Sequence, residues 1–132
     1  MTNYVLDSCI VIALLYKEKG FEKVVELLSE KNLNDSEIYM STVNFGEVSW
    51  FLYKNSPEKA EFLLQAVKDL KINFVSPDID DSESAGFYKS QGGVAYPDCF
   101  VLSLAKKLQA KIVTKDKEFK KFESEFEIIW LD

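Results

Sequence analysis

The sequence predicts an α/β fold of three layers, with helices on both faces of a mostly parallel, twisted sheet of four to five strands. The alternation of segments along the chain, together with its length and composition, leads to this prediction. Short apolar runs alternate along the chain with longer amphipathic segments of helical period. Such alternation is typical of βαβ units, in which a helix connects each strand to the next. The length, 132 residues, suits one domain over residues 1–132, and a hydrophobic content of 47% can supply its core.

The predicted strands are short apolar runs bounded by polar residues, and they lie at residues 3–6, 37–41, 72–75, 111–114 and 127–130. The predicted helices show apolar residues at helical spacing, and they cover about residues 9–16, 21–30, 42–54, 56–70, 80–92 and 96–108. We expect a polar loop over residues 32–36 and a loop or helical turn over 116–122.

Several helix starts carry recognisable capping residues. Ser56–Pro57 supplies an N-cap serine and a proline at the first helical position. Asp80, with Glu83 three residues later, fits a capping box, and Tyr96–Pro97 begins the helix that follows. Thr42 or Asn44 is expected to cap the helix that runs to about residue 54.

The composition excludes several kinds of chemistry. The chain has no histidine, so neither histidine-based acid–base cleavage nor a Ser–His or Cys–His nucleophile is available. Cys9 and Cys99 are too few for a disulfide framework, and we expect both to be reduced thiols in the core. No apolar run reaches the roughly 18 residues of a membrane helix, and no basic leader precedes the first strand. We therefore expect a cytoplasmic protein without a membrane partner.

The charge is unevenly distributed along the chain. The net charge is −6, yet residues 106–121 hold seven lysines against two acids, a local charge of +5. A phosphate backbone could dock on such a basic face. The alternative is an ordinary lysine-rich surface exposed to water.

Four carboxylates lie where a strand ends or a helix begins: Asp7, Glu47, Asp98 and Asp116. Each has a structural explanation, because these positions suit an N-cap, a capping box with Asn44, a helix first turn and an Asx-turn respectively. Together they are harder to explain, since apolar residues surround Asp7, Glu47 and Asp98 and the chain has no arginine to pair with them. Clustered acids with oxygen ligands suit Mg²⁺ or Mn²⁺. In a parallel sheet, the first and last of the four would share one edge.

The contexts of these acids carry a resemblance to a known family. They are the blocks Tyr4–Ser8, Ser41–Val48, Pro97–Ala105 and Ile112–Phe119. In these blocks the chain resembles the PIN domain, specifically the small toxin ribonucleases of bacterial and archaeal toxin–antitoxin pairs. The resemblance covers nearly the whole chain and implies a PIN-like nuclease domain. The absence of arginine and the Tyr96–Pro97 pair before the third acid depart from the usual pattern.

The resemblance implies a metal-dependent endoribonuclease that cleaves RNA phosphodiesters with a metal-activated water. The family's catalytic acids map onto the four carboxylates, of which the three aspartates would hold Mg²⁺ or Mn²⁺. Glu47 would be a ligand or would position the water. Ser8 and Thr114 would hydrogen-bond a ligand carboxylate or the water. Lys115 and Lys117 are candidate phosphate contacts.

The resemblance also implies partners: an RNA substrate, an antitoxin protein and a second copy of the chain in a homodimer. Trp50 and Phe62 could form a dimer contact, although core packing is the expected role of both. Two other functions stay open. One is a PIN-like protein-binding module without catalysis. The other is a receiver-type phosphoacceptor domain, which would need an acceptor aspartate at the end of the third strand, where Asp78 comes some three residues late.

Overall fold

Five parallel strands form a sheet at the centre of the molecule, in the order β3-β2-β1-β4-β5. The computed structural model describes residues 1–131, apart from the side chains of Glu30 and Lys31. The strands are β1 (Thr2–Leu6), β2 (Ser36–Ser41), β3 (Asn73–Val75), β4 (Lys111–Thr114) and β5 (Ile128–Trp130). The predicted parallel sheet is confirmed, and each predicted strand lies within one or two residues of its expected bounds.

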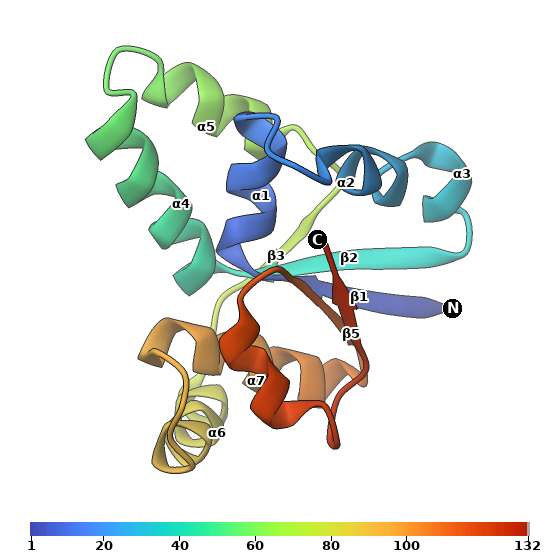
Figure 1. The fold of residues 1–132 in the computed structure, drawn as a ribbon, viewed down its shortest axis with the longest axis vertical. Helices are drawn as coiled ribbons and strands as arrows, with labels where there is room; N and C mark the ends of the chain where they lie inside the picture. Colours follow the sequence, from blue (N-terminus) through green and yellow to red (C-terminus); the bar gives the residue numbers. More distant parts are fainter. Residues whose placement is uncertain (132) are drawn as a thin grey trace.

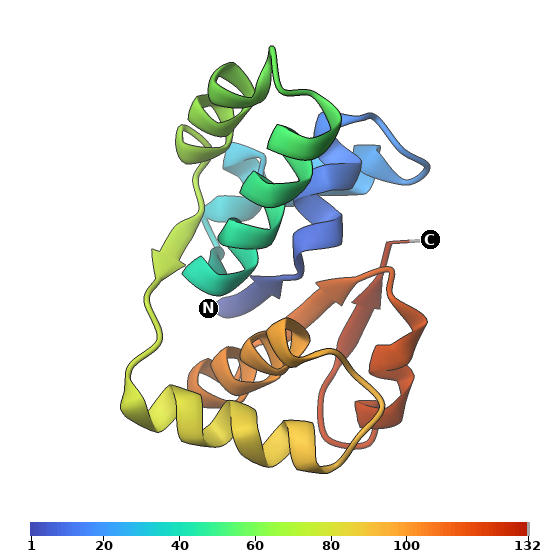
Figure 2. The ribbon, with the colours of Figure 1, turned by 90° about the vertical axis from the view of Figure 1, so that its left-hand side faces the viewer.

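Helices fill the connections between the strands, as predicted. They are α1 (Ser8–Leu15), α2 (Phe21–Leu27), α3 (Glu30–Leu33), α4 (Thr42–Asn55), α5 (Ala60–Lys68), α6 (Ile79–Ser90) and α7 (Tyr96–Leu108). A 3₁₀-helix, η1 (Lys117–Phe122), connects β4 to β5. Figures 1 and 2 show α6 and α7 on one side of the sheet and α1, α2, α4 and α5 on the other. The three-layer architecture is therefore confirmed.

Successive residues of a strand point to opposite faces of the sheet, so each central strand contributes to two cores. In β1, Val5 packs among residues of α6, α7 and η1, such as Tyr88 and Phe119. Its neighbour Leu6 packs on the other face among residues of α1, α4 and α5, including Val48. Both strand residues are fully buried, so β1 is fixed in position from both sides.

The order of the strands determines where a ligand site can form. From β1 the chain moves outward to β2 and β3, and the second half returns to the other side of β1 as β4 and β5. The switch point therefore lies between β1 and β4, which pair directly from Tyr4–Lys111 to Leu6–Val113. In open α/β sheets, ligands bind at the carboxyl ends of the strands beside such a point. Asp7 follows β1 and Asp116 follows β4 at this position.

Two predicted helix starts are wrong in detail. Ser41, rather than Thr42 or Asn44, caps α4, and its hydroxyl accepts a 3.2 Å hydrogen bond from the N–H of Val43. The capping box of α6 is Asp78 with Asp81, two residues before the expected pair. The spacing of three residues recurs among the acids of this segment, so the pattern alone could not select the box that forms.

The start of α5 and the exposure of two residues on α4 and α5 also differ from the prediction. Residues 57–59 form a turn, and α5 begins at Ala60. Ser56 instead follows the end of α4, and its hydroxyl is hydrogen-bonded to Tyr16 at 2.6 Å. Trp50 and Phe62 are 64% and 77% exposed, so their expected core packing is wrong. Each lies two residues from a buried position of its helix and therefore faces away from the sheet.

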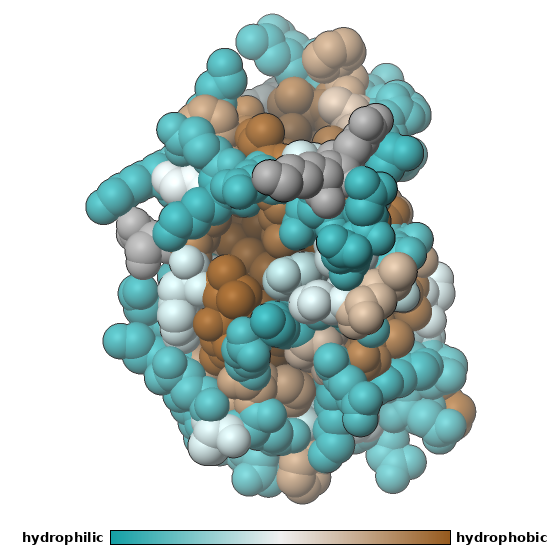
Figure 3. All heavy atoms as spheres, turned by 90° about the vertical axis from the view of Figure 1, so that its right-hand side faces the viewer, coloured by the Kyte–Doolittle hydropathy of each residue, from teal (hydrophilic) through white to brown (hydrophobic). Residues whose placement is uncertain are grey.

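The face on which β1 and β2 begin is shown in Figure 3, where polar residues surround an apolar hollow near the centre. This face is opposite to the carboxyl ends of the strands. Among residues 1–131, no helix is long and apolar enough to cross a membrane.

Candidate metal centre

Three aspartates from separate parts of the sequence meet at the carboxyl edge of the sheet. Asp7 is the N-cap of α1, Asp98 is the third residue of α7, and Asp116 is the N-cap of η1. Each offers one carboxylate oxygen, and these three oxygens lie within 4.8 Å of one another. The prediction that Asp7 and Asp116 share one edge of the parallel sheet is confirmed, and Asp98 joins them from α7. Their role as metal ligands stays a prediction.

Asp7 is the most firmly held of the three. It is 2% exposed, and its Oδ1 accepts a 2.7 Å hydrogen bond from the N–H of Ser8. Its Oδ2 accepts from the hydroxyl of Thr114 at 2.8 Å and from the thiol of Cys9 at 3.3 Å. Burial raises the pKa of Asp7 above its ordinary value, although the bonds from Thr114 and Cys9 oppose this rise. Asp7 is therefore oriented by its neighbours but costly to ionise.

Asp98 is buried without a compensating cation. It is 7% exposed, and its carboxylate accepts no hydrogen bond from any residue that the structure describes. Burial raises its pKa to about 8, with further contributions from the charges of Asp7, Asp116 and Glu47. A buried carboxylate surrounded by other carboxylates needs a positive charge to ionise at neutral pH. No lysine whose side chain the structure describes forms an ion pair with Asp98.

Asp116 and Thr114 connect the third acid to the first. The hydroxyl of Thr114 accepts a 3.0 Å hydrogen bond from the N–H of Asp116 while it donates to Asp7. The carboxylate of Asp116 accepts from the N–H of Glu118 at 3.0 Å, which is the turn role considered from the sequence. Ser8, the other predicted polar residue, has its hydroxyl 3.4 Å from Oδ1 of Asp7, so its main-chain N–H makes the closer contact.

Glu47 stands outside the group of three but close enough to act on it. It is half-buried on α4, and its charge raises the pKa of both Asp7 and Asp98. Its Oε1 accepts a 3.1 Å hydrogen bond from the side-chain amide of Asn44. The capping box expected between these residues is absent, because Ser41 supplies the cap of α4.

Two polar residues at the centre were not identified from the sequence. The thiol of Cys9 contacts Asp7 and lies 3.6 Å from the hydroxyl of Thr114. Burial and the charge of Asp7 raise the pKa of Cys9 to about 12, so it stays a neutral thiol. Asn44, fully buried, connects Glu47 to α7. The available signals were the position of Cys9 in the helix turn that Asp7 caps and the three-residue spacing of Asn44 and Glu47.

The lysine-rich segment does not present a free basic face. Four of its seven lysines form ion pairs with acids, namely Lys106–Glu125, Lys107–Asp81, Lys111–Glu127 and Lys115–Glu18. Lys117 lies over the ring of Trp130, with 4.9 Å from its Nζ to the ring centroid. Acids outside the segment therefore balance most of its local charge of +5, although Lys117 remains exposed next to Asp116.

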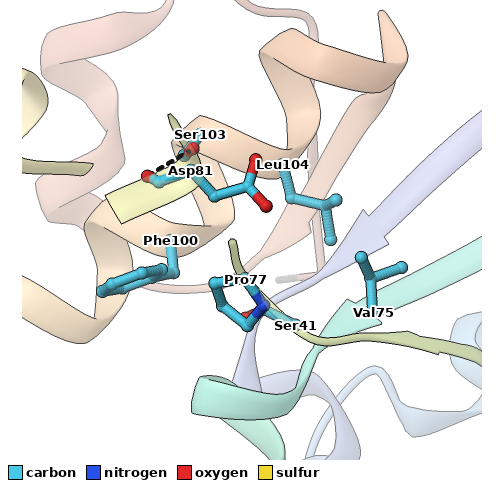
Figure 4. Close-up of a pocket in the computed structure, with 7 residues that line it drawn as sticks. All are labelled: Ser41, Val75, Pro77, Asp81, Phe100, Ser103 and Leu104. Atoms are coloured by element: carbon cyan, nitrogen blue, oxygen red, sulfur yellow. Dashed lines mark hydrogen bonds between the residues drawn. The ribbon is translucent and has the colours of Figure 1, made fainter. Parts of the chain in front are cut away.

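A small cavity lies apart from the aspartates, between the ends of β2 and β3 and the helices α6 and α7. Figure 4 shows its lining, in which the hydroxyl of Ser103 donates to the carbonyl of Asp81 at 3.1 Å. Its volume is about 10 Å³, which is close to the space that one water molecule needs. This cavity is too small for a substrate. The aspartate cluster is the candidate site because three carboxylate oxygens that could hold a metal ion meet there.

The chemistry of the cluster suits a hard divalent cation. All three donors are carboxylate oxygens, the ligand type that Mg²⁺ and Mn²⁺ prefer. A cation there would remove the repulsion among the acids and supply the charge that Asp98 lacks. The thiol of Cys9 is engaged with Asp7 rather than free to coordinate.

Comparison with known proteins agrees with this architecture. The sequence model described as the PIN domain matches residues 4–125, which is most of the chain. The chain belongs to the PIN domain family. No curated protein sequence matches it significantly. The resemblance inferred from the four acidic blocks is thus confirmed for the family.

Solved structures share the PIN domain fold at low sequence identity. VapBC2 from Rickettsia felis, bound to a DNA fragment from its promoter, superposes with a TM-score of 0.77 at 16% identity, covering 99% of this chain and 100% of that chain. A toxin–antitoxin complex from Klebsiella pneumoniae gives 0.76 at 16% identity, with 98% of each chain covered. VapC20 from Mycobacterium tuberculosis, a toxin that cleaves the sarcin–ricin loop, gives 0.72 at 13% identity, with 93% and 95% covered.

Proposed function

We propose that this PIN domain is a metal-dependent endoribonuclease and the toxin of a toxin–antitoxin pair, with residues 1–132 acting as one nuclease domain. The observation that carries the proposal is Asp98, a buried carboxylate that lies with Asp7 and Asp116 and that no described lysine pairs with; burial and these charges raise its pKa to about 8. Keeping such a group is costly unless a bound cation compensates it. Because the chain has no histidine, it cannot cleave RNA by histidine-based acid–base chemistry, and a metal-activated water is the nucleophile that we propose instead.

The residues of the centre take distinct roles in this proposal. Asp7, Asp98 and Asp116 would hold Mg²⁺ or Mn²⁺, since each offers a carboxylate oxygen to the cluster. When bound, the cation activates a water as nucleophile and stabilises charge that develops on the phosphate. Thr114, with Ser8, fixes the orientation of Asp7. Glu47 contributes a fourth negative charge beside the cluster and positions water there.

Binding of RNA requires positive charge near this acidic centre. Lys115 and Lys117 flank Asp116 and are the proposed phosphate contacts. Lys117 is exposed, whereas the ammonium of Lys115 is paired with Glu18. Lys117 is therefore the stronger candidate of the two.

An antitoxin and a second copy of the chain are the proposed protein partners. Solved structures that share this fold are toxin–antitoxin complexes, two of them described above. A net charge of −6 suits a partner segment with basic residues. Trp50 and Phe62, exposed on α4 and α5, would supply apolar contact area. A toxin of this kind acts on RNA in the cytoplasm, in keeping with the location expected from the sequence.

A protein-binding module without catalysis is the second candidate, and the exposed Trp50 and Phe62 are the observation that favours it. A receiver-type phosphoacceptor is not supported. The aspartate that follows β3, Asp78, caps α6 together with Asp81 and lies outside the aspartate cluster.

The test is cleavage of single-stranded and structured RNAs by the purified protein with Mn²⁺ or Mg²⁺, beside an EDTA control. Asp98→Asn is expected to abolish cleavage. Asp80→Asn changes an exposed aspartate outside the cluster and is expected to cleave like the wild type. If the protein cuts no RNA and Mn²⁺ does not raise its melting temperature, the protein-binding module becomes the better account.

A further inference from the structure

Asn44 occupies an unusual place between α4 and α7. It is the third residue of α4 and is completely buried. Its Nδ2 donates to Oε1 of Glu47 at 3.1 Å and to the carbonyl oxygen of Pro97 at 3.0 Å. Pro97 immediately precedes Asp98 in α7. The side-chain amide of Asn44 therefore connects Glu47 on α4 with the turn of α7 that carries Asp98.

The orientation of this amide is determined by its partners. Both are acceptors, a carboxylate oxygen and a carbonyl oxygen, so only the NH₂ group can face them. Oδ1 then faces elsewhere, buried and without a hydrogen-bond partner among the described residues. A buried acceptor without a donor is disfavoured, and such a group is retained in native structures for a reason.

The structure indicates what this reason is. Glu47 is half-buried, and among the described residues its carboxylate accepts a hydrogen bond only from Asn44. Without this bond, a flexible glutamate beside the clustered carboxylates of Asp7, Asp98 and Asp116 would turn away from them toward water. The second bond, to Pro97, anchors the amide to α7 and so sets the direction in which Glu47 is held.

We propose that Asn44 is a positioning residue that holds the carboxylate of Glu47 beside the three aspartates, against their repulsion. Its effect on cleavage rests on the nuclease function proposed above, whereas its effect on cation binding does not. Asn44 is not itself a catalytic residue, because it acts through Glu47.

The test measures Mn²⁺ affinity by calorimetry and RNA cleavage for the wild type, Asn44→Ala, Glu47→Gln and the double variant. Asn44→Ala is expected to lower kcat by about 10- to 100-fold with little change in KM, and to weaken Mn²⁺ binding in the same direction. In the Glu47→Gln background, Asn44→Ala should change either quantity less than about threefold, because the carboxylate that Asn44 positions has already been replaced by a neutral amide. Equal losses in both backgrounds would show a general packing role and overturn the proposal.

Asn73→Ala is the matched control. Asn73 also donates from Nδ2 to a glutamate, Glu37 at 2.8 Å, and to a carbonyl, that of Ile38 at 3.0 Å. It begins β3, which lies two strands away from β1, and neither of its partners belongs to the aspartate cluster. Asn73→Ala should therefore leave both quantities unchanged. If Asn44→Ala does not fold, Asn44→Ser replaces it, since a hydroxyl is too short to reach both acceptors.

The outcomes separate this proposal from the nuclease function. Asn44→Ala that matches the wild type in both measurements would overturn the positioning role and leave the nuclease intact. A wild type that binds Mn²⁺ but cuts no RNA would overturn the nuclease, while the Mn²⁺ titrations would still decide the role of Asn44.

Discussion

The hydroxyl of Thr114 donates a 2.8 Å hydrogen bond to Oδ2 of Asp7. The two residues lie at the carboxyl ends of adjacent strands, β4 and β1, and Thr114 is completely buried. The same hydroxyl accepts from the N–H of Asp116 at 3.0 Å. One side chain therefore fixes the relative positions of two of the three proposed metal ligands.

Thr114→Val should weaken cation binding without disrupting the strand, because valine has nearly the same shape and suits a buried strand position. The change leaves Asp7 with one donor fewer and the N–H of Asp116 unpaired. We expect Mn²⁺ affinity to fall by about 10- to 100-fold, as for other residues that orient metal ligands. Thr114→Ser, which keeps the hydroxyl, should restore most of the affinity in a calorimetric titration. Unchanged binding by the valine variant would mean that Asp7 needs no such support.

Asp98→Asn should stabilise the metal-free protein while it abolishes cleavage. Because the pKa of Asp98 is raised to about 8 in the fold, the folded state holds this proton more tightly than the unfolded chain does. The stability that the protonated carboxyl of Asp98 contributes to the fold is fully present below about pH 4 and is lost as the pH rises toward 8. The variant should therefore melt higher than the wild type at pH 8, by about 3–5 °C for each kcal/mol recovered.

Melting Asp98→Asn and the wild type at pH 4 provides a control for the comparison at pH 8. At pH 4 both side chains are essentially neutral, so the melting temperatures of Asp98→Asn and the wild type should converge in EDTA. Asp80→Asn, at an exposed position, should change little at either pH. A variant that melts lower than the wild type at pH 8 would show that the carboxylate is not under strain in the empty site.

The strands and the shared edge of Asp7 and Asp116 could be predicted from the sequence because both depend on local signals. Short apolar runs mark the strands, and a parallel sheet brings the residues that follow β1 and β4 together without further information. The contacts of Asn44 could not be predicted, since its partner Pro97 belongs to a helix 53 residues away in the sequence. The pairing of Lys107 with Asp81 depends in the same way on how α7 packs against α6.

Exposed apolar residues were harder to place for a related reason. Core packing was the expected role of Trp50 and Phe62, yet both lie on the faces of α4 and α5 that point away from the sheet. Helical period shows which residues share a face. It does not show whether another layer of the protein covers that face, and the structure leaves both side chains more than half exposed.

Cation affinity should rise with pH up to about 8 and then level off. A cation binds ionised carboxylates, and Asp98 is mostly protonated below its pKa of about 8. Binding must displace this proton, so Mn²⁺ affinity should increase about tenfold per pH unit between pH 6 and 7.5. Titrations in two buffers of different ionisation enthalpy would count the protons released. Affinity that does not change over this range would contradict the raised pKa of Asp98.

Lys117 and Lys115 should differ in their effect on RNA binding, because their ammonium groups are differently engaged. Lys117 is exposed beside Asp116, and its contact with Trp130 leaves it open to a phosphate. The ammonium of Lys115 is already paired with Glu18. Lys117→Ala should raise the KM for RNA several-fold at unchanged kcat and lower the salt dependence of binding by about one counterion. Lys115→Ala should have a smaller effect on both. Equal effects of the two substitutions would mean that RNA displaces Glu18, and no effect of either would place the RNA on another surface.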